Sequence, residues 1–410
     1  MDEGTPQPID LDHPRNPIRE TAVFSFFLGL SVLFLCDGLW PYPGAGTFGG
    51  GCLEYVWSGW WLKEGLLTRP LDPLFCPLIY WPVGASVAFH DFSYLNTLPS
   101  VFLPTDFLLG WHNLCLVATF ALSGYFMYRF AFEVTGSRTG AVFAGLIFAF
   151  APFRTSRLTQ LNTLSQEFIP LLFLVAWRVD VGRSQANWKA AMLGGSFLAL
   201  SALGSWYHLS ILTVVLVAWG VWKWRLWFWG FLCRLFFVSG AILSPWLIQI
   251  VWHQIRFDYY PHTLVRSHRF SCDLLYYFVP YEYDSWSYSK IVPKIESTIG
   301  PGWITSPERV GYFLGYVAIF LAAIALFRRP KRVWSLWVFL GLVAIILSLG
   351  PYLKVGGRDT INLGKLFDLL GFPESWTEDW TPKFPLPFLL FKEIPLIGGA
   401  AVPRRFAEIV

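Results

Sequence analysis

The sequence predicts an all-α protein, a polytopic transmembrane helical bundle of about nine spans with two long outer-face loops. Three observations lead to this fold class. The 410-residue chain is 55% hydrophobic and has a mean hydropathy of +0.48. Only 14% of its residues are charged, whereas soluble domains usually carry about 25%. Aromatic residues make up 19% of the chain, and tryptophan and tyrosine concentrate at membrane–water interfaces.

Apolar stretches separated by polar turns are the predicted spans, because about 20 apolar residues cross a bilayer. They cover residues 21–36, 107–132, 140–152, 168–179, 190–203, 207–222, 226–252, 310–327 and 333–349. The stretch at 168–179 is short, so we expect its helix to begin earlier, within the polar segment RLTQLNTLSQE.

Three regions follow from these spans. Residues 1–20 are expected to form a cytosolic N-terminal tail, and residues 21–350 the transmembrane domain. Residues 351–410 are expected to form an outer-face loop and the start of a truncated C-terminal region, because the chain stops shortly after PRRF.

Basic residues indicate the orientation. They flank the connections near residues 129–138, 178–189, 223–225 and 328–332, and they also precede the first span. With the N-terminus in the cytoplasm, every one of these groups lies on the cytoplasmic side, as the positive-inside rule requires. The long loops, about residues 37–106 and 253–308, then lie at the outer face.

Composition also excludes some function classes. The net charge of +4 is spread along the chain, and no basic run is long enough to follow a phosphate backbone, so we expect no nucleic-acid partner. The six cysteines form no CxxC pair and no metal-binding spacing with histidine. Spacing alone does not establish a disulfide between Cys52 and Cys76. The sequence contains no nucleophile elbow, P-loop, HExxH or dinucleotide fingerprint.

Residues 52–67, CLEYVWSGWWLKEGLL, form a predicted helix in the first long loop. Leucine, valine and tryptophan recur at helical spacing, with Glu54 and Ser58 one turn apart on another side. A helix with tryptophan on one face and charge on the other tends to lie in the membrane interface. We therefore expect an interfacial amphipathic helix, whose polar side is the candidate floor of an active site.

The first long loop also supplies the candidate catalytic acids, Asp37 and Glu54. Asp37 ends the first span, where the bilayer edge desolvates a carboxylate, so it is either functional or a cap in the headgroup layer. Asp72, before a proline, is interpreted as a turn residue. The neighbours His90 and Asp91 are weak candidates for binding a metal or a phosphate.

The segment at residues 154–167, RTSRLTQLNTLSQE, is unusually polar for its place between two apolar stretches. Polar groups at membrane depth usually line a cavity. Its candidate substrate-binding residues are Arg154, Arg157, Gln160, Asn162 and Glu167. The two arginines are one turn apart and could hold a lipid phosphate, or the segment is a cavity-facing helix end without a catalytic role.

The second long loop contains a basic cluster that includes Arg266 and Arg269. Such a cluster beside a membrane suits an anionic headgroup or a pyrophosphate, and an ordinary solvated loop is the alternative.

Several stretches together carry a family resemblance. They are CLEYVWSGWWLKEGLL, YWPVGASVAFHDFSYLN, GSRTGAVFAGLIFAFAPFR, LTQLNTLSQEFIPLL, SPERVGYFLGY and AVPRRF. From about residue 45 onward the chain resembles the large bacterial multi-span membrane proteins of the GT-C glycosyltransferase type. The resemblance implies transfer of a sugar from a polyprenyl-phosphate carrier to an envelope acceptor, at the outer face of a bacterial cytoplasmic membrane. It also implies an acid in the first outer loop that acts as a base or as a ligand of a divalent metal ion, Mg²⁺ or Mn²⁺.

The chain departs from that family's pattern at two places. Gly51 stands where the resembling proteins have an acid, and Thr159 and Gln160 stand where they have a Gly–His pair. Both changes remove groups that bind a metal or move a proton. Either Glu54 or Asp37 replaces the acid, or the protein is a non-catalytic relative, for example a transporter or flippase of lipid-linked substrates. A transporter is expected to show internal repeats, and the sequence shows none.

Overall fold

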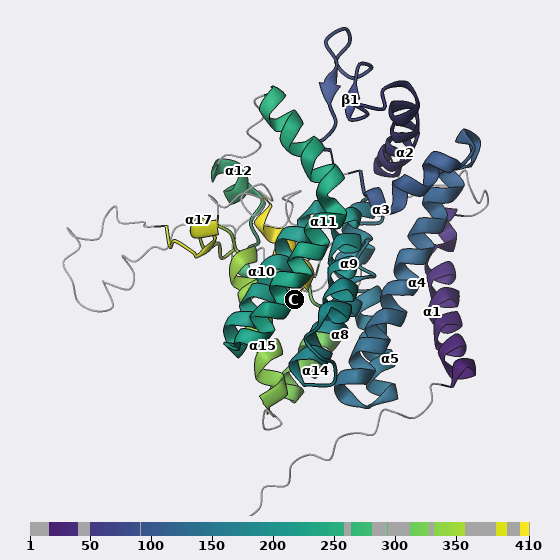
Figure 1. Cartoon of the computed structure of the whole chain (residues 1–410). Helices are drawn as coiled ribbons and strands as arrows, with labels where there is room; N and C mark the ends of the chain where they lie inside the picture. The colour runs from purple at the N-terminus through teal and green to yellow at the C-terminus, as the bar shows by residue number, and fades with distance from the viewer. Residues whose placement is uncertain are drawn as a thin grey trace, which may run out of the picture. The chain divides into compact units, whose positions relative to one another are not determined.

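The computed structural model describes residues 16–39, 50–90, 92–257, 264–280, 293, 312–327, 332–356, 383–391 and 402–409 (Figure 1). These residues are mostly helical, which confirms the predicted helical class. The strands β1 (Phe75–Cys76) and β2 (Ala85–Ser86) pair antiparallel, with Phe75 opposite Ser86. Cys52 and Cys76 are both buried, and no disulfide joins them.

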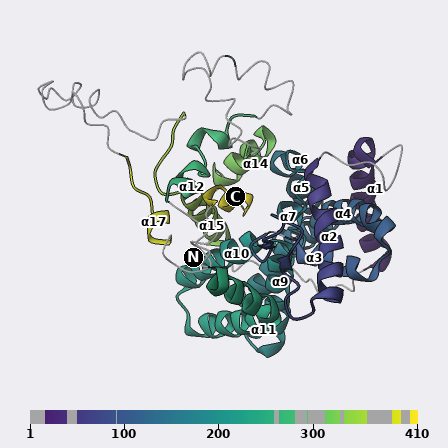
Figure 2. The same cartoon turned by 90° about the horizontal axis from the view of Figure 1, so that it is seen from above.

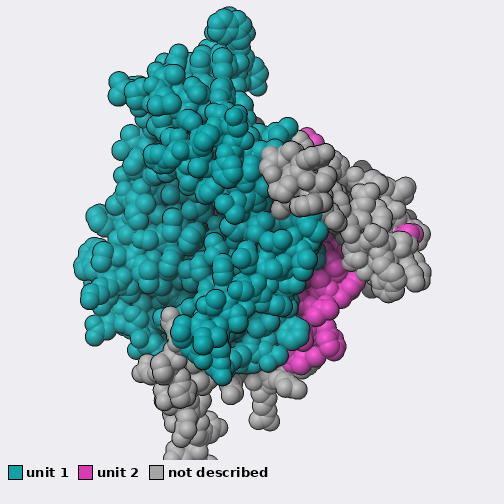
Figure 3. All heavy atoms as spheres, turned by 90° about the vertical axis from the view of Figure 1, so that its right-hand side faces the viewer, with its two compact units in different colours: residues 1–205, 225–257 teal, residues 206–224, 258–410 magenta. Residues whose placement is uncertain are grey.

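The chain divides into two compact units, which Figure 3 distinguishes by colour. Unit 1 consists of Met1–Ser205 and Arg225–Phe257, and unit 2 of Trp206–Trp224 and Asp258–Val410. The helices of unit 1 are α1 (Pro17–Leu39), α2 (Gly50–Thr68), α3 (Tyr94–Thr97), η1 (Leu98–Phe102), η2 (Thr105–Phe107), α4 (Leu108–Thr135), α5 (Arg138–Ala149), α6 (Pro152–Thr155), α7 (Leu161–Leu164), α8 (Ile169–Asp180), α9 (Trp188–Gly204) and α11 (Leu226–Phe257). The helices of unit 2 are α10 (Trp206–Lys223), α12 (Leu264–Arg269), η3 (Leu274–Tyr277), α14 (Tyr316–Phe327), α15 (Arg332–Ser348), α17 (Phe388–Phe391) and η7 (Pro403–Ile409).

Three helices within the described residues are long and apolar enough to cross a membrane. They cover Pro17–Cys36, Thr105–Thr135 and Leu226–Phe257, and they coincide with three of the predicted spans. The helices α5 and α8 have 12 residues each and therefore extend only about 18 Å, which is shorter than a hydrocarbon core of about 30 Å. The count of nine spans stays a prediction.

One predicted boundary is wrong. The helix α8 begins at Ile169, with Pro170 in its first turn, and does not extend back into the polar segment. That segment instead contains the short helices α6 and α7, joined by turns. Prolines explain part of this break, because Pro152 and Pro170 both occupy first-turn positions, where the missing N–H costs nothing.

The helices α1, α4 and α5 lie side by side in both views of unit 1 (Figure 1 and Figure 2). Phe27 of α1 is fully buried among them and occupies the space left by two glycines. A Cβ atom added to Gly124 would lie 2.4 Å from Cδ1 of Phe27, and one added to Gly145 would lie 2.5 Å from its Cζ. Small residues thus let these helices approach closely, which is how helices commonly associate inside membranes.

The helix α2 is present where the sequence predicts it, but its buried stripe differs from the prediction. Cys52, Tyr55 and Leu62 are buried, whereas Leu53 is 53% exposed. Trp61, expected on a lipid-facing side, is 4% exposed and donates a hydrogen bond to the carbonyl of Pro73 at 3.2 Å. One side of α2 therefore packs on its own loop and on α4, because the loop folds back over the tryptophans.

The first long loop is attached to the end of α11. Asp72 lies between two basic side chains, with Nε2 of His253 at 2.9 Å and Nη1 of Arg256, the charged partner, at 2.8 Å. The ring of Phe75 stacks on Phe257, at 5.8 Å between centroids. Asp72 is therefore more than a turn residue, because it holds the hairpin of β1 and β2 against α11.

Unit 2 contains a buried ionic cluster between α10 and η7. Glu408 accepts a hydrogen bond from Nη1 of Arg405 at 3.0 Å and lies 3.3 Å from Nε2 of His208. Burial opposes a charge on Arg405, but Glu408 raises the pKa of the guanidinium above its ordinary value, so it stays charged. Nearby, burial raises the pKa of the Tyr277 phenol well above its usual range, and its hydroxyl pairs with Ser348.

We expect Gly145→Ala to lower the free energy of unfolding by about 1–3 kcal/mol, because the new methyl group overlaps the ring of Phe27 and the carbonyl of Gly124. Thermal unfolding in detergent micelles measures the change. Gly240→Ala is the matched control, since α11 has open space there and alanine favours a helix. Equal unfolding temperatures for the two variants would contradict the close packing.

We expect Arg405→Met to destabilise the protein by about 3–5 kcal/mol, because Glu408 would keep a buried charge without its arginine. The measurement is chemical unfolding followed by the circular dichroism of the helices. Arg269→Met, at an exposed position of α12, should change stability by less than about 0.5 kcal/mol. A smaller loss at Arg405 than at Arg269 is the result that rejects this role.

Candidate functional site

The start of α2 lies on the polar segment at residues 154–167, about 100 positions later in the chain. A Cβ atom at Gly51 would lie 3.0 Å from Cβ of Thr159. The thiol of Cys52 donates to the carbonyl of Leu158 at 3.8 Å, and the hydroxyl of Tyr55 donates to Oδ1 of Asn162 at 2.6 Å. The two stretches that the sequence singles out separately are therefore one structural feature.

Arg154 is held inside the bundle, with 1% of its surface exposed. It donates hydrogen bonds from Nε to the carbonyl of Ala149 at 3.0 Å and from Nη2 to the carbonyl of Thr119 at 3.3 Å. Its guanidinium also lies over the ring of Phe120, 4.8 Å from the centroid. Arg154 thereby satisfies the last carbonyl of α5, which favours the structural alternative over a phosphate-binding role.

The other polar residues of the segment are also engaged with the protein. Arg157 is 2% exposed and donates to Oε1 of Gln160 at 2.6 Å. Glu167 is 4% exposed and accepts a hydrogen bond from the hydroxyl of Thr119 at 2.5 Å. These contacts meet the general requirement that buried polar groups have partners, so the segment is an internally bonded layer.

The accessible polar groups lie on another side of α2. Glu54 is 56% exposed, and its Oε1 lies 3.4 Å from Nε2 of His90. The hydroxyl of Ser58 lies 3.3 Å from the same nitrogen and donates to the carbonyl of Glu54 at 2.7 Å. Both contacts use Nε2, so the arrangement is not a serine–histidine–acid relay, which needs a different ring nitrogen for each partner. What it provides is a solvent-accessible carboxylate beside an imidazole.

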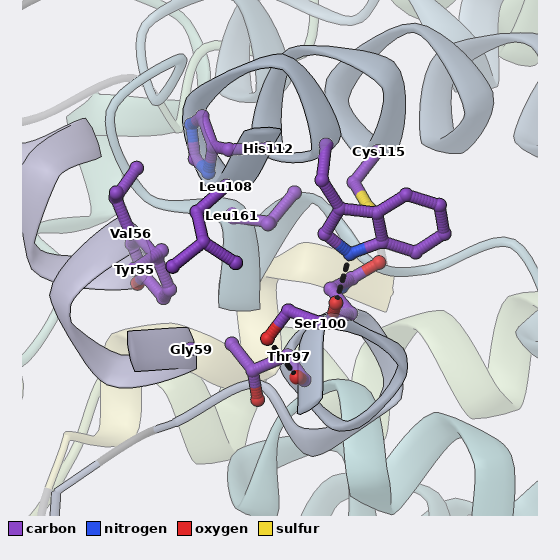
Figure 4. Close-up of a pocket in the computed structure, with 11 residues that line it drawn as sticks. Tyr55, Val56, Gly59, Thr97, Ser100, Leu108, His112, Cys115 and Leu161 are labelled. Atoms are coloured by element: carbon purple, nitrogen blue, oxygen red, sulfur yellow. Dashed lines mark hydrogen bonds between the residues drawn. The ribbon is translucent and has the colours of Figure 1, made fainter. Parts of the chain in front are cut away.

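A pocket lies between α2 and α4 (Figure 4). Its volume is about 240 Å³ including the space at its mouth, and the enclosed part has room for about one water molecule at most. The ring of His112 faces Tyr55 across it, with 6.0 Å between the ring centroids. The absence of a side chain at Gly59 lets η1 pack closely against α2 beside the pocket. A Cβ atom at Gly59 would lie 2.6 Å from Oγ of Ser100.

Three sequence candidates have side chains outside the described residues, and a fourth lies in unit 2. Asp37 is in the last turn of α1, but its side chain is outside the described residues. Asp91 and the side chain of Arg266 are also outside them. Arg269 is exposed on α12 in unit 2, with its guanidinium 6.0 Å from the ring centroid of Phe270. Their proposed roles remain predictions.

The described side chains around Glu54 do not fit the expected Mg²⁺ or Mn²⁺ ion. Across the ranges that the structure describes, no group of three His, Cys, Asp or Glu side chains converges. Around Glu54 the nearby donors are one imidazole and one hydroxyl, whereas Mg²⁺ prefers carboxylate, phosphate and water oxygens. We therefore derive no reaction step through a metal ion.

Three residues of the pocket and its surroundings escape the sequence-based prediction: Tyr55, Asn96 and His112. A usable signal was present for His112, because WHN interrupts an apolar stretch at residues 111–113, and polar groups inside spans tend to be functional. Tyr55 and Asn96 had no such signal, since a tyrosine in an aromatic helix and an asparagine in a loop are unremarkable in a sequence.

Comparisons with known proteins give one match. The family described as "Domain of unknown function (DUF6311)" matches residues 46–368, which is most of the chain. No curated protein and no solved structure matches the chain.

We expect Tyr55→Phe to destabilise the protein by about 1–3 kcal/mol, because it leaves the buried Oδ1 of Asn162 without the phenol. The unfolding temperature in micelles measures the loss. Tyr80→Phe is the control, since Tyr80 is 80% exposed and its loss of a hydroxyl should be neutral. If both variants unfold like the wild type, the contact between α2 and the polar segment does not contribute to stability.

Proposed function

Because the chain belongs to the DUF6311 family, whose description assigns no activity, we propose a function from its own residues: glycosyl transfer at a membrane. The proposed protein is of the GT-C type, with about nine spans and a cytoplasmic N-terminus in a bacterial cytoplasmic membrane. It transfers a sugar from a polyprenyl-phosphate carrier to an envelope acceptor at the outer face. The apolar length of three helices supports the membrane setting.

The observation that carries the proposal is the position of Glu54. It is the accessible acid of α2, and His90 from the far end of the loop lies beside its carboxylate. A carboxylate fixed by a neighbour but open to solvent is suited to act as a general base. Since α2 rests on the polar segment through Tyr55 and Asn162, the base is mounted on a rigid part of unit 1.

The reaction follows from these groups. The carboxylate of Glu54 accepts the proton of the acceptor hydroxyl, whose oxygen attacks the anomeric carbon of the donor sugar. The bond between that carbon and the phosphate oxygen breaks, and polyprenyl phosphate leaves with the electron pair. A single displacement inverts the configuration at the anomeric carbon. Arg154 and Arg157 hold the polar segment in this scheme, and Arg266 and Arg269 remain the sequence's candidates for binding the phosphate.

A non-catalytic role is the second candidate, and Gly51 favours it. The resembling glycosyltransferases carry an acid at this position, but here a Cβ atom would lie 3.0 Å from Thr159. The chain has therefore closed the position by packing, in addition to removing the carboxylate. A relative without turnover could still bind or transport lipid-linked substrates.

We expect Glu54→Gln to lower turnover by roughly 10²-fold or more, because an amide cannot accept the proton. The assay uses the purified full chain, short-chain polyprenyl-phosphate sugars and an acceptor extract. Glu64→Gln, three turns along α2, is the matched control and should retain activity. Full activity of Glu54→Gln would leave α2 without a catalytic role. Absence of turnover with every donor in the wild type would support the non-catalytic candidate.

A further inference from the structure

His112 occupies an unusual environment in the pocket between α2 and α4. The residue is 3% exposed, and it lines the pocket. Neither Nδ1 nor Nε2 has a hydrogen-bond partner among the residues that the structure describes. A neutral imidazole has one donor and one acceptor, and buried polar groups are nearly always paired with protein or with ordered water. An imidazole left in this state points to a missing partner inside the pocket.

The surrounding side chains do not supply that partner, because they already bond elsewhere. The phenol of Tyr55 donates to Asn162, and the indole N–H of Trp111 donates to the carbonyl of Asn96 at 2.7 Å. The hydroxyl of Ser100 donates to the carbonyl of Thr97 at 2.5 Å (Figure 4). His112 is thus distinguished from the other polar groups of the pocket wall.

The pocket also restricts the chemistry of the occupant. None of its lining residues is an aspartate, a glutamate, a lysine or an arginine. They are Tyr55, Val56, Gly59, Asn96, Thr97, Ser100, Leu108, Trp111, His112, Cys115 and Leu161. A phosphate or a carboxylate would therefore enter without a compensating charge. A hydroxyl group both donates and accepts, so it pairs with either the protonated or the unprotonated nitrogen of a neutral ring, and its size matches the enclosed space.

We propose that this pocket is a binding site for one hydroxyl group of a neutral ligand, held against His112. Glu54, Ser58 and His90 do not line the pocket, so it is a separate site from the accessible carboxylate. The hydroxyl comes either from an ordered water molecule or from an alcohol such as a sugar. The inference stands on the pocket alone and does not depend on the proposed transfer reaction.

The test uses the full chain in lipid nanodiscs, labelled with ¹⁵N on its seven histidines. His112→Gln identifies the signals of His112. If that variant does not fold, Tyr55→Phe identifies them through the altered neighbouring ring. The probes are methyl β-D-glucopyranoside, which has hydroxyl groups, and 2-methoxytetrahydropyran, an ether of related ring shape that has none.

A magnetisation transfer from a bound water proton to the His112 ring without any probe supports the proposal and assigns the hydroxyl to water. A saturable shift of the His112 nitrogen signals with the glucoside, absent with the ether, supports it and assigns the hydroxyl to an alcohol. The proposal is overturned if the ring shows no water contact and no response to the glucoside. Where the ring shows no water contact, it is equally overturned if the ether shifts the signals as much as the glucoside does.

Discussion

Buried hydrogen-bonding groups need partners, and in this protein that requirement is concentrated in one short stretch of chain. Between the end of α5 and the start of α8 the chain forms only the four-residue helices α6 and α7 and the turns around them, which leaves carbonyl and amide groups inside an apolar bundle without the bonds of a continuous helix. Arg154 satisfies the carbonyls of Ala149 and Thr119, and Asn162 accepts the phenol of Tyr55. The position of α2, and with it both parts of the site, depends on these bonds.

The same requirement separates the charged residues into two groups. Arg154, Arg157 and Glu167 are almost completely buried and hydrogen-bonded to protein atoms. Their hydrogen bonds therefore stabilise the fold. Glu54 keeps contact with solvent and has a neighbouring imidazole, which leaves it able to exchange protons with a substrate. Chemistry in this protein is therefore expected from the side of α2 that the polar segment does not occupy.

The two histidines near α2 illustrate how different environments give one residue type different uses. His90 lies at the surface of its loop between Glu54 and Ser58 and makes edge-on contact with Trp57. His112 is enclosed by α2, α4 and α7 and faces a small neutral pocket. We propose proton transfer at an accessible carboxylate for the first and recognition of a neutral group for the second.

The sequence anticipated much of the helical framework. Apolar stretches located α1, α4 and α11 to within a few residues, because a long unbroken apolar run has few alternatives to a helix in lipid. It was wrong about the start of α8 and about Trp61, since both depend on how a loop folds back. It named Glu54 and His90 independently, but their contact joins residues 36 positions apart and no local pattern encodes such a pairing.

By itself, then, the sequence determined where the long apolar helices lie and which residue types are available for chemistry, because periodicity and composition are local properties of the chain. Only the tertiary structure decided how those residues are used. Gly51 meets Thr159, Tyr55 meets Asn162, and His112 faces a pocket without a partner, because packing brings together residues 50 to 110 positions apart. Burial, set by that packing, then fixed which polar groups stabilise the fold and which remain open to a ligand.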